Sequence, residues 1–463
     1  MPFNLLRQSA VLFVLLVVGV VGESVAQDVA QAAPQSGATP PASYANYTVP
    51  ARCARLAPRL EHQRERALRP DTIPYVPFGR NPYAPDIVDA VRQCVAKFSI
   101  ETIPERDLLW LAEAYLAAND DARATAALRR ASAVWAHLPI PQRAWRLATV
   151  VDVYAFARPA RLHAADSILT ILDALGAPAA MARLMAHGTM TRLAAWADSD
   201  AMIAPHARTA IAAAAQMVGE ERHQRAMDEA TVRYALGTWY ARHELFDSAR
   251  ALARETRTTI APLNPAMSYG LEQYEKYQDW VGTPAKPMVA EKWYDNPTNA
   301  SYPRKGKPTL ILLVGHWCAD YCYPGYAVVR RLQRKYGDKL DVVLSSRTFG
   351  FYRNKLRDST EEMNLADTYF RDYLKLQTPM GMVVTRYTIR DDGVMMEDQT
   401  PDNIAYGMAW EFASLNLAFV VVDDKGRIRM GGGLTPQKEA QVDHLIGEIQ
   451  SQEAIQLQRK AAH

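Results

Sequence analysis

The sequence predicts a multidomain protein in which an all-α region is followed by an α/β domain. Residues 100–265 are rich in alanine, poor in glycine and patterned with a helical period. After residue 305, short continuous apolar runs alternate with amphipathic segments, as is typical of buried strands separated by helices. At 463 residues the chain is long enough for two or three cores. We therefore expect at least two folded domains.

The composition is that of a soluble globular protein, with 49% apolar and 22% charged residues. The formal net charge of +3 is small for this length, and the sequence contains neither a basic run nor basic residues interleaved with aromatic ones. A nucleic-acid partner is therefore not expected.

Residues 1–26 have the pattern of a secretory signal peptide. Arg7 precedes an apolar run at residues 11–22, and Ser24 and Ala26 are the small residues at positions minus three and minus one of a cleavage site. We expect an exported protein, periplasmic or extracellular, that is attached to a membrane only if this segment stays uncleaved. Residues 27–50 are rich in Ala, Pro, Ser and Thr, and they are expected to form a disordered tether.

Export matters for the four cysteines, because thiols outside the cytoplasm can oxidise. The cysteines fall into two pairs, Cys53 with Cys94 and Cys318 with Cys322. Cys94 lies on the apolar stripe of a helix expected at residues 86–98, so a disulfide to Cys53 would join two short helices. Two buried free thiols are the alternative. In either case this first pair is expected to be structural.

The helical domain is expected to span residues 51–282, and it contains a faint internal repeat. With a constant offset of 125 residues, Leu111, Ala112, Tyr115 and Ala124 recur as Leu236, Gly237, Tyr240 and Ala249. These small and aromatic positions resemble those of tetratricopeptide repeats, in which each helical hairpin buries its face against its neighbour. The resemblance implies about four stacked hairpins that bind a protein partner. A plain helical bundle that only supports the next domain is the alternative.

Residues 283–304 are rich in Pro, Asn, Ser and Lys and are expected to be a linker, after which residues 305–455 form the α/β domain. The expected order is strand, helix, strand, helical insert, hairpin and helix, at residues 309–314, 324–337, 340–345, 347–411, 417–430 and 435–450. The hairpin is expected to turn at Gly426, where a left-handed backbone favours glycine.

Two motifs of this domain resemble thioredoxin-like reductases of the TlpA/ResA type. Trp317-Cys318 follows a buried strand directly, and Val422-Asp423-x-x-Gly426-Arg427 stands at the later hairpin. The resemblance covers about residues 300–455. It implies a thioredoxin-like fold and an exported thiol–disulfide oxidoreductase that acts on proteins through a redox-active disulfide and needs no other cofactor. Cys318 would be the nucleophile, and Cys322 would resolve the mixed disulfide.

The residues around the cysteines support this chemistry. A strand-to-helix turn places Cys318 near a helix N-terminus, where unpaired N–H groups and the macrodipole stabilise a thiolate. A protonated His316 would act in the same direction, whereas Asp320 would oppose it. Trp317 would pack beside the sulfur and limit access to it. Leu417 stands where the family has a cis-proline that faces the cysteines. At this position the sequence departs from the family, and the resemblance does not extend to the docking of a substrate beside the disulfide.

The spacing C-x-x-x-C, where the family has C-x-x-C, leaves two other functions open. Alpha carbons four residues apart on a helix lie about 6.2 Å from each other, which a disulfide can span. The same spacing occurs in Sco-type copper proteins, and two thiolates suit Cu(I). In those proteins a histidine stands just before the third strand. Here no histidine stands just before residue 417, and His444 lies on the last helix instead. The third possibility is an adaptor that has kept the fold without the chemistry. No other metal site is expected from the scattered histidines.

Overall fold

The computed structural model describes residues 49–67, 83–157, 160–197, 199–288, 290–295, 301–316, 319–353, 355–373, 376, 378–384, 387–389, 395–397, 417–434 and 438–461. The expected signal peptide and nearly all of the expected tether lie outside these residues. The chain divides into two compact units, one comprising residues 21–236 and the other containing residues 237–463. We call them the helical unit and the α/β unit.

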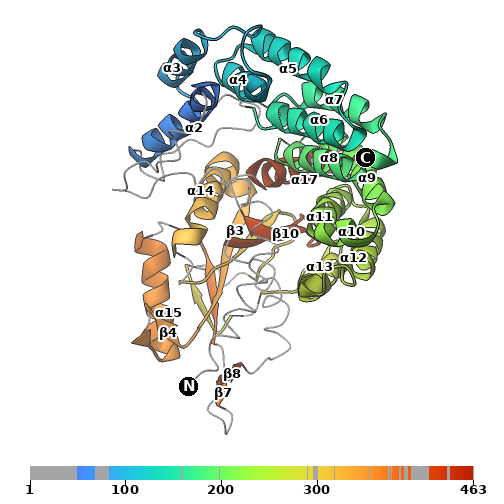
Figure 1. The fold of residues 1–463 in the computed structure, drawn as a ribbon. Helices are drawn as coiled ribbons and strands as arrows, with labels where there is room; N and C mark the ends of the chain where they lie inside the picture. The colour runs from blue at the N-terminus through green and yellow to red at the C-terminus, as the bar shows by residue number, and fades with distance from the viewer. Residues whose placement is uncertain are drawn as a thin grey trace. The chain divides into compact units, whose positions relative to one another are not determined.

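The helical unit is built from consecutive helices joined by short turns (Figure 1). They are α2 (Val49–Ala67), α3 (Pro85–Val95), α4 (Leu108–Ala117), α5 (Asp121–Trp135), α6 (Ile140–Ala155), α7 (Leu162–Asp173), α8 (Ala180–Trp196), α9 (Asp200–Gln216), α10 (Gly219–Gln224) and α11 (Ala226–Arg242), the last of which continues into the other unit. Helix α4 packs on α5, α6 on α7 and α8 on α9, and the first helices of successive pairs also pack on one another. Stacked helix pairs are therefore present, while the likeness to tetratricopeptide repeats stays a prediction.

The 125-residue repeat extends from the side chains to the backbone. Asn119, in the turn between α4 and α5, has a φ of 58°, and Glu244, 125 positions later, has a φ of 59°. The N–H that follows each of them donates to the carbonyl of the repeat tyrosine, Tyr115 at 2.8 Å and Tyr240 at 2.9 Å. The same turn closes two helix pairs, and so the two sequence segments form the same local structure.

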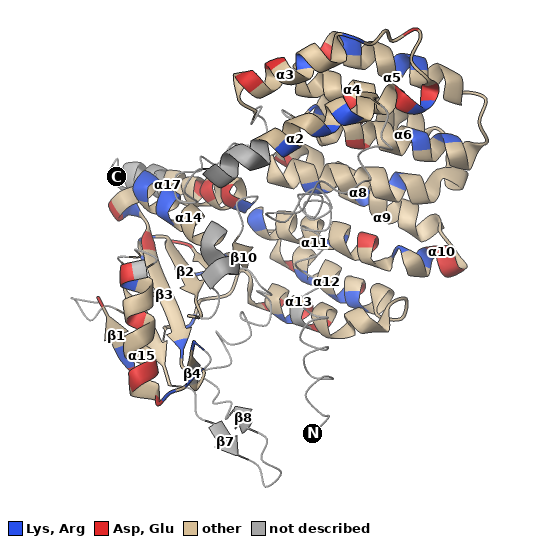
Figure 2. Ribbon diagram, turned by 60° about the vertical axis from the view of Figure 1, so that its left-hand side comes forward, with Lys and Arg blue, Asp and Glu red and all other residues tan. Residues whose placement is uncertain are grey.

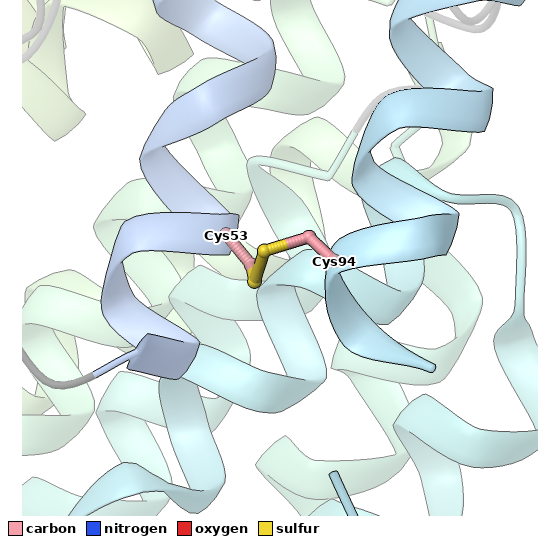
Figure 3. The surroundings of a disulfide bond; sticks show 2 residues. All are labelled: Cys53 and Cys94. Atoms are coloured by element: carbon pink, nitrogen blue, oxygen red, sulfur yellow. A yellow bond between two sulfur atoms is a disulfide. The ribbon is translucent and has the colours of Figure 1, made fainter. Parts of the chain in front are cut away.

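The expected disulfide joins Cys53 of α2 to Cys94 of α3, with the two Cα atoms 5.8 Å apart (Figure 3). Cys53 is fully buried, whereas Cys94 is partly exposed at the edge of the apolar face that Val91 and Val95 turn to the core. The bridge thus links a core position of the first helix to a rim position of the second. Both signs of charge are interspersed along the helices (Figure 2), as the small net charge suggests.

The α/β unit begins with two helices and continues as a sheet covered by helices. Its elements are α12 (Phe246–Ile260), α13 (Ser268–Trp280), β1 (Lys292–Tyr294), β2 (Thr309–Leu313), α14 (Ala319–Tyr336), β3 (Asp341–Arg347), β4 (Phe351–Tyr352), β5 (Lys355–Leu356), α15 (Ser359–Thr368), β6 (Met380–Val383), β7 (Tyr387–Ile389), β8 (Met395–Glu397), β9 (Leu417–Val422), β10 (Ile428–Leu434) and α17 (Glu439–Ala461). A π-helical turn, Tyr369–Tyr373, extends α15.

The main sheet has the strand order β1-β6-β3-β2-β9-β10. Strands β2, β3 and β6 are parallel, while β9 is antiparallel to both β2 and β10. A helix connects β2 to β3, and another follows the β9–β10 hairpin. The helical region and this mixed sheet are compatible with the expected combination of an all-α part and a thioredoxin-like α/β domain.

Strand β2 is buried on both faces, which explains why every residue after Thr309 in it is apolar. Leu310 and Leu312 belong to the core that includes the buried residues of α14 and α17. Ile311 and Leu313 point to the opposite face and join a smaller core with Met288 and others. The alternation follows the two-residue period of a strand.

Three features differ from the sequence expectations. Helix α14 begins at Ala319, five residues before Pro324, so Cys322 lies within the helix. The insert, expected to be helical, also contributes the strand β6 to the main sheet. At the junction between the expected helical domain and the expected linker, the chain bonds to the hairpin. Gly282 N–H donates to Ile428 O at 2.8 Å, and Ile428 N–H donates to Thr283 O at 2.9 Å. Among the described helices, none has the length and apolar character needed to cross a membrane.

Candidate functional site

The predicted cysteine site lies where β2 ends and α14 begins. Trp317 and Cys318 themselves are outside the described residues, as are the side chains of Cys322 and Leu417. The backbone register places Leu313, the last residue of β2, opposite Ala418 of β9. Leu417 therefore starts its strand at the same edge of the sheet at which the chain leaves β2 toward Cys318. The roles assigned to these residues stay predictions.

His316 is the site residue whose surroundings the structure describes. Its side chain is 2% exposed, two residues before Cys318 in the sequence. The backbone before it is held against β3, because Val314 N–H donates to Ser345 O at 2.9 Å and the Ser346 hydroxyl donates to Val314 O at 2.8 Å. The imidazole packs against two aromatic rings, with centroid distances of 5.5 Å to Phe349 and 5.0 Å to Tyr352.

Glu362 of α15 is the partner of His316, and its side chain is fully buried. Its Oε1 lies 2.9 Å from Nε2 of His316 and accepts the N–H of Phe349 at 2.7 Å, while its Oε2 accepts the N–H of Gly350 at 2.8 Å. One carboxyl group thus joins the end of β2 to the loop after β3. Glu362 does not stand out in the sequence, because 46 residues separate it from His316 and an acidic residue in a first helical turn is ordinarily explained by the helix dipole.

The rim of this site combines cationic and apolar groups. The Arg347 guanidinium lies 5.2 Å from the Phe349 ring centroid, and that of Arg353 lies 5.5 Å from the Tyr352 ring centroid. Leu356, on the short strand β5, is 86% exposed. A buried histidine–glutamate contact thus lies two residues before Cys318 in the sequence, and exposed side chains of Arg353 and Leu356 lie in the segment after β3.

His444, the histidine named with the copper alternative, lies at the surface of α17. Its Nε2 is 3.0 Å from Glu448. Within the described part of the chain, no three His, Cys, Asp or Glu side chains gather as a metal-binding group.

Two buried histidines, His187 and His206, lie together in the helical unit. Nδ1 of His187 lies 3.0 Å from Nδ1 of His206, and Nε2 of His187 lies 3.1 Å from Oδ1 of Asp173. Nε2 of His206 is 3.6 Å from Asp166, too far for a good hydrogen bond. Burial, with repulsion from His187, lowers the pKa of His206 to about 4. These two histidines are core residues of the helical unit.

Comparisons with known proteins give little further information. The chain matches no protein-family model and no curated protein sequence. Among solved structures it is similar to a crystal structure of a thioredoxin-like superfamily protein, at 14% identity, with 36% of this chain and 95% of that chain covered and a TM-score of 0.26. The assignment of the fold therefore rests on the chain's own strand order and connections.

Proposed function

We propose that the α/β unit is a thioredoxin-like domain of the TlpA/ResA type that exchanges disulfides with protein substrates outside the cytoplasm. The observation that carries this proposal is the place of the cysteine pair in the fold. Cys318 immediately precedes Ala319, the first residue of α14, and Cys322 follows in that helix. The unpaired N–H groups of a helix N-terminus favour a thiolate there.

The reaction needs only the two cysteines and the substrate. The Cys318 thiol loses its proton, and the thiolate attacks one sulfur of a substrate disulfide, so that a new S–S bond forms and the other substrate sulfur leaves as a thiolate that takes up a proton. Cys322 then attacks the Cys318 sulfur as a thiolate, which releases the second substrate thiol and leaves a Cys318–Cys322 disulfide. Two electrons pass to the substrate, and an external dithiol restores the reduced pair. The reverse sequence oxidises a substrate dithiol.

The helical unit has a separate role in this proposal. Stacked helix pairs are used by repeat proteins to bind partners, and we assign to the helical unit the binding of the protein partner on which the cysteines act. An adaptor without redox chemistry is the second candidate, and Leu417 at the position of the family's cis-proline favours it. The two functions differ in whether partner binding requires the cysteines.

The test is a set of cysteine variants of the whole exported chain. The reduced wild type should reduce insulin disulfides and should be alkylated by iodoacetamide at Cys318 at about pH 6, where an ordinary thiol is mostly protonated. Cys318→Ser should abolish exchange, and Cys322→Ser should accumulate mixed disulfides. Cys94→Ala, which removes only the structural bridge, is the matched control and should keep the activity.

Each alternative has its own outcome in the same experiment. A wild type that neither exchanges disulfides nor is alkylated faster than an ordinary thiol would overturn the oxidoreductase, and partner binding that survives both substitutions would then identify the adaptor. Tight Cu(I) binding that is lost in either variant, without exchange, would identify a copper carrier.

A further inference from the structure

We infer that the β4–β5 hairpin is a docking element for the substrate, and that it favours a polypeptide segment in which an apolar side chain is flanked by acidic residues. The inference rests on the proposed function and adds to it the chemistry of the substrate beside the exchanged disulfide. It begins from Leu356, whose side chain is 86% exposed on a strand of two residues. No other large apolar side chain of the described residues is as exposed.

The hairpin lies at the edge of the sheet from which the cysteine segment starts. Strands β2 and β3 are parallel, with Leu313 opposite Ser345, so the chain leaves both strands at the same edge. The ring centroid of Tyr352 in β4 lies 5.0 Å from that of the His316 imidazole. Two residues of chain, at most about 8 Å of backbone, separate His316 from Cys318. A polypeptide that exchanges its disulfide there is therefore within reach of the hairpin.

The charge of the segment after β3 is the second observation. Between Asp341 and Asp358 the sequence contains no acidic residue and four cationic ones, which are Arg347, Arg353, Lys355 and Arg357. Arg353 and Lys355 are exposed, and the described part of the chain provides neither with a carboxylate partner. An exposed leucine beside two such cations is complementary to an apolar side chain beside acidic ones.

The base of the hairpin is fixed to α15. Glu362 accepts the N–H of Phe349 at 2.7 Å and that of Gly350 at 2.8 Å. The N–H of Arg357 donates to Gly350 O at 3.1 Å, which closes the base. The Arg357 guanidinium in turn lies 2.6 Å from Glu361. Because the exposed end stands on a fixed base, docking on it orders few additional residues, which limits the entropic cost of binding.

An anionic membrane surface is the other partner with matching chemistry. Two observations favour the protein substrate over it: the contact of Tyr352 with the imidazole of His316, and the sheet edge that the hairpin shares with the cysteine segment. Both place the hairpin beside the proposed reaction. The experiment nevertheless includes vesicles, so that the two partners are distinguished.

Three short peptides, each with one intramolecular disulfide, serve as substrates for the whole reduced chain. Beside the disulfide, one peptide carries a leucine between two glutamates, the second a leucine between two lysines, and the third a serine between two glutamates. The rate constant for oxidation of the protein by each peptide is measured by acid quenching and mass spectrometry. The wild type should react with the first peptide about fivefold faster than with the second. It should react about tenfold faster than with the third, at the lower end of what burial of a leucine contributes.

Two variants test the two parts of the surface. Leu356→Ser should slow the reaction with the leucine–glutamate peptide about tenfold and change that with the serine peptide by less than about twofold. Lys355→Glu should remove the preference for glutamate over lysine. Leu356→Met keeps an apolar side chain, and Lys339→Glu makes the same charge change at an exposed position before the opposite end of β3. Both are controls and should stay within about twofold of the wild type.

Hydroxyethyl disulfide, a small neutral compound with no segment to dock, separates this inference from the proposed function. A wild type that exchanges neither with it nor with the peptides overturns both. A wild type that exchanges, with Leu356→Ser and Lys355→Glu at its own rates for every peptide, overturns the inference alone. Losses that extend equally to hydroxyethyl disulfide show a damaged exchange site and also overturn it. Binding to phosphatidylglycerol vesicles that Leu356→Ser abolishes, with unchanged peptide rates, would assign the hairpin to a membrane instead.

Discussion

Removal of the Cys53–Cys94 disulfide is expected to lower the local stability of α2 and α3 by about 4 kcal/mol. The bridge closes a loop with a sequence separation of 41 residues. In the chain-entropy model, a loop of that length restricts the unfolded segment by roughly 4 kcal/mol at 25 °C. Cys53 is fully buried, so its replacement by alanine adds a cavity term of about 1 kcal/mol, while the half-buried Cys94 adds less.

Hydrogen exchange measured by mass spectrometry resolves this effect within the large chain. Peptides from α2 and α3 are compared in the oxidised protein, the reduced protein, Cys94→Ala and Cys53→Ala. Reduction should speed exchange in these helices by roughly 10³-fold, since each 1.4 kcal/mol corresponds to a factor of ten. Peptides from α8 and α9 should be unaffected. The reduced wild type serves as the reference that separates loop closure from cavity.

The relative exchange rates of the variants test this prediction most strictly. Cys94→Ala should match the reduced wild type, and Cys53→Ala should exchange about five times faster than either, because only it leaves a void in the core. If reduction changes the exchange of α2 and α3 by less than threefold, the loop-closure reasoning is wrong. Equal exchange in the two variants would show that the burial of Cys53 contributes nothing.

Three further predictions concern pH and backbone geometry. The lowered pKa of His206, about 4 against an ordinary 6.5, means that the unfolded chain binds this proton more readily. The contribution of this group to the free energy of unfolding is therefore complete above about pH 6.5 and is lost as the pH falls toward 4. In denaturant titrations His206→Asn should reduce the loss of unfolding free energy at pH 5 by about 2 kcal/mol. An unchanged pH profile would refute this. Burial raises the pKa of Glu113 to about 7, with Arg55 opposing, so stability is lost as the pH rises through 7. Between pH 5 and pH 8 the free energy of unfolding of Glu113→Gln should therefore rise by about 2 kcal/mol relative to that of the wild type. The absence of such a relative rise would contradict the reasoning. Gly282 has a φ of 86°, and a Cβ there would lie 2.6 Å from the Phe246 ring. Gly282→Ala should lower the stability measured by thermal unfolding by about 3 kcal/mol, whereas the control Gly306→Ala, also at positive φ but in open space, should lower it by about 1 kcal/mol. Equal losses would disprove a steric origin.

Patterns confined to a short segment were the predictable part of the fold. The run at residues 309–314 is apolar at every position from Leu310 onward because β2 is buried on both faces, and that property is visible in one window. The hairpin at Gly426 was likewise predictable, since its φ of 82° and the Asp423 side chain, which accepts the N–H of Arg427 at 2.8 Å, are local turn features.

Features that depend on distant segments were not predictable in the same way. Strand β6 is four residues long and contains Gly381, so its composition favours no strand. The glycine is explained only by the fold, because a Cβ there would lie 2.9 Å from that of Ala290. The same reason applies to Glu362, whose three partners are brought together only when β2, β3 and α15 are assembled.

Glu362 also shows how the fold accommodates a buried carboxyl group. Burial of a polar group is costly unless hydrogen bonds compensate for the lost water. Here Oε1 accepts the N–H of Phe349 and lies 2.9 Å from Nε2 of His316, while Oε2 accepts the N–H of Gly350. One side chain in the first turn of α15 therefore joins the end of β2 to the loop after β3, and its replacement by an apolar residue would remove the acceptor of two backbone N–H groups.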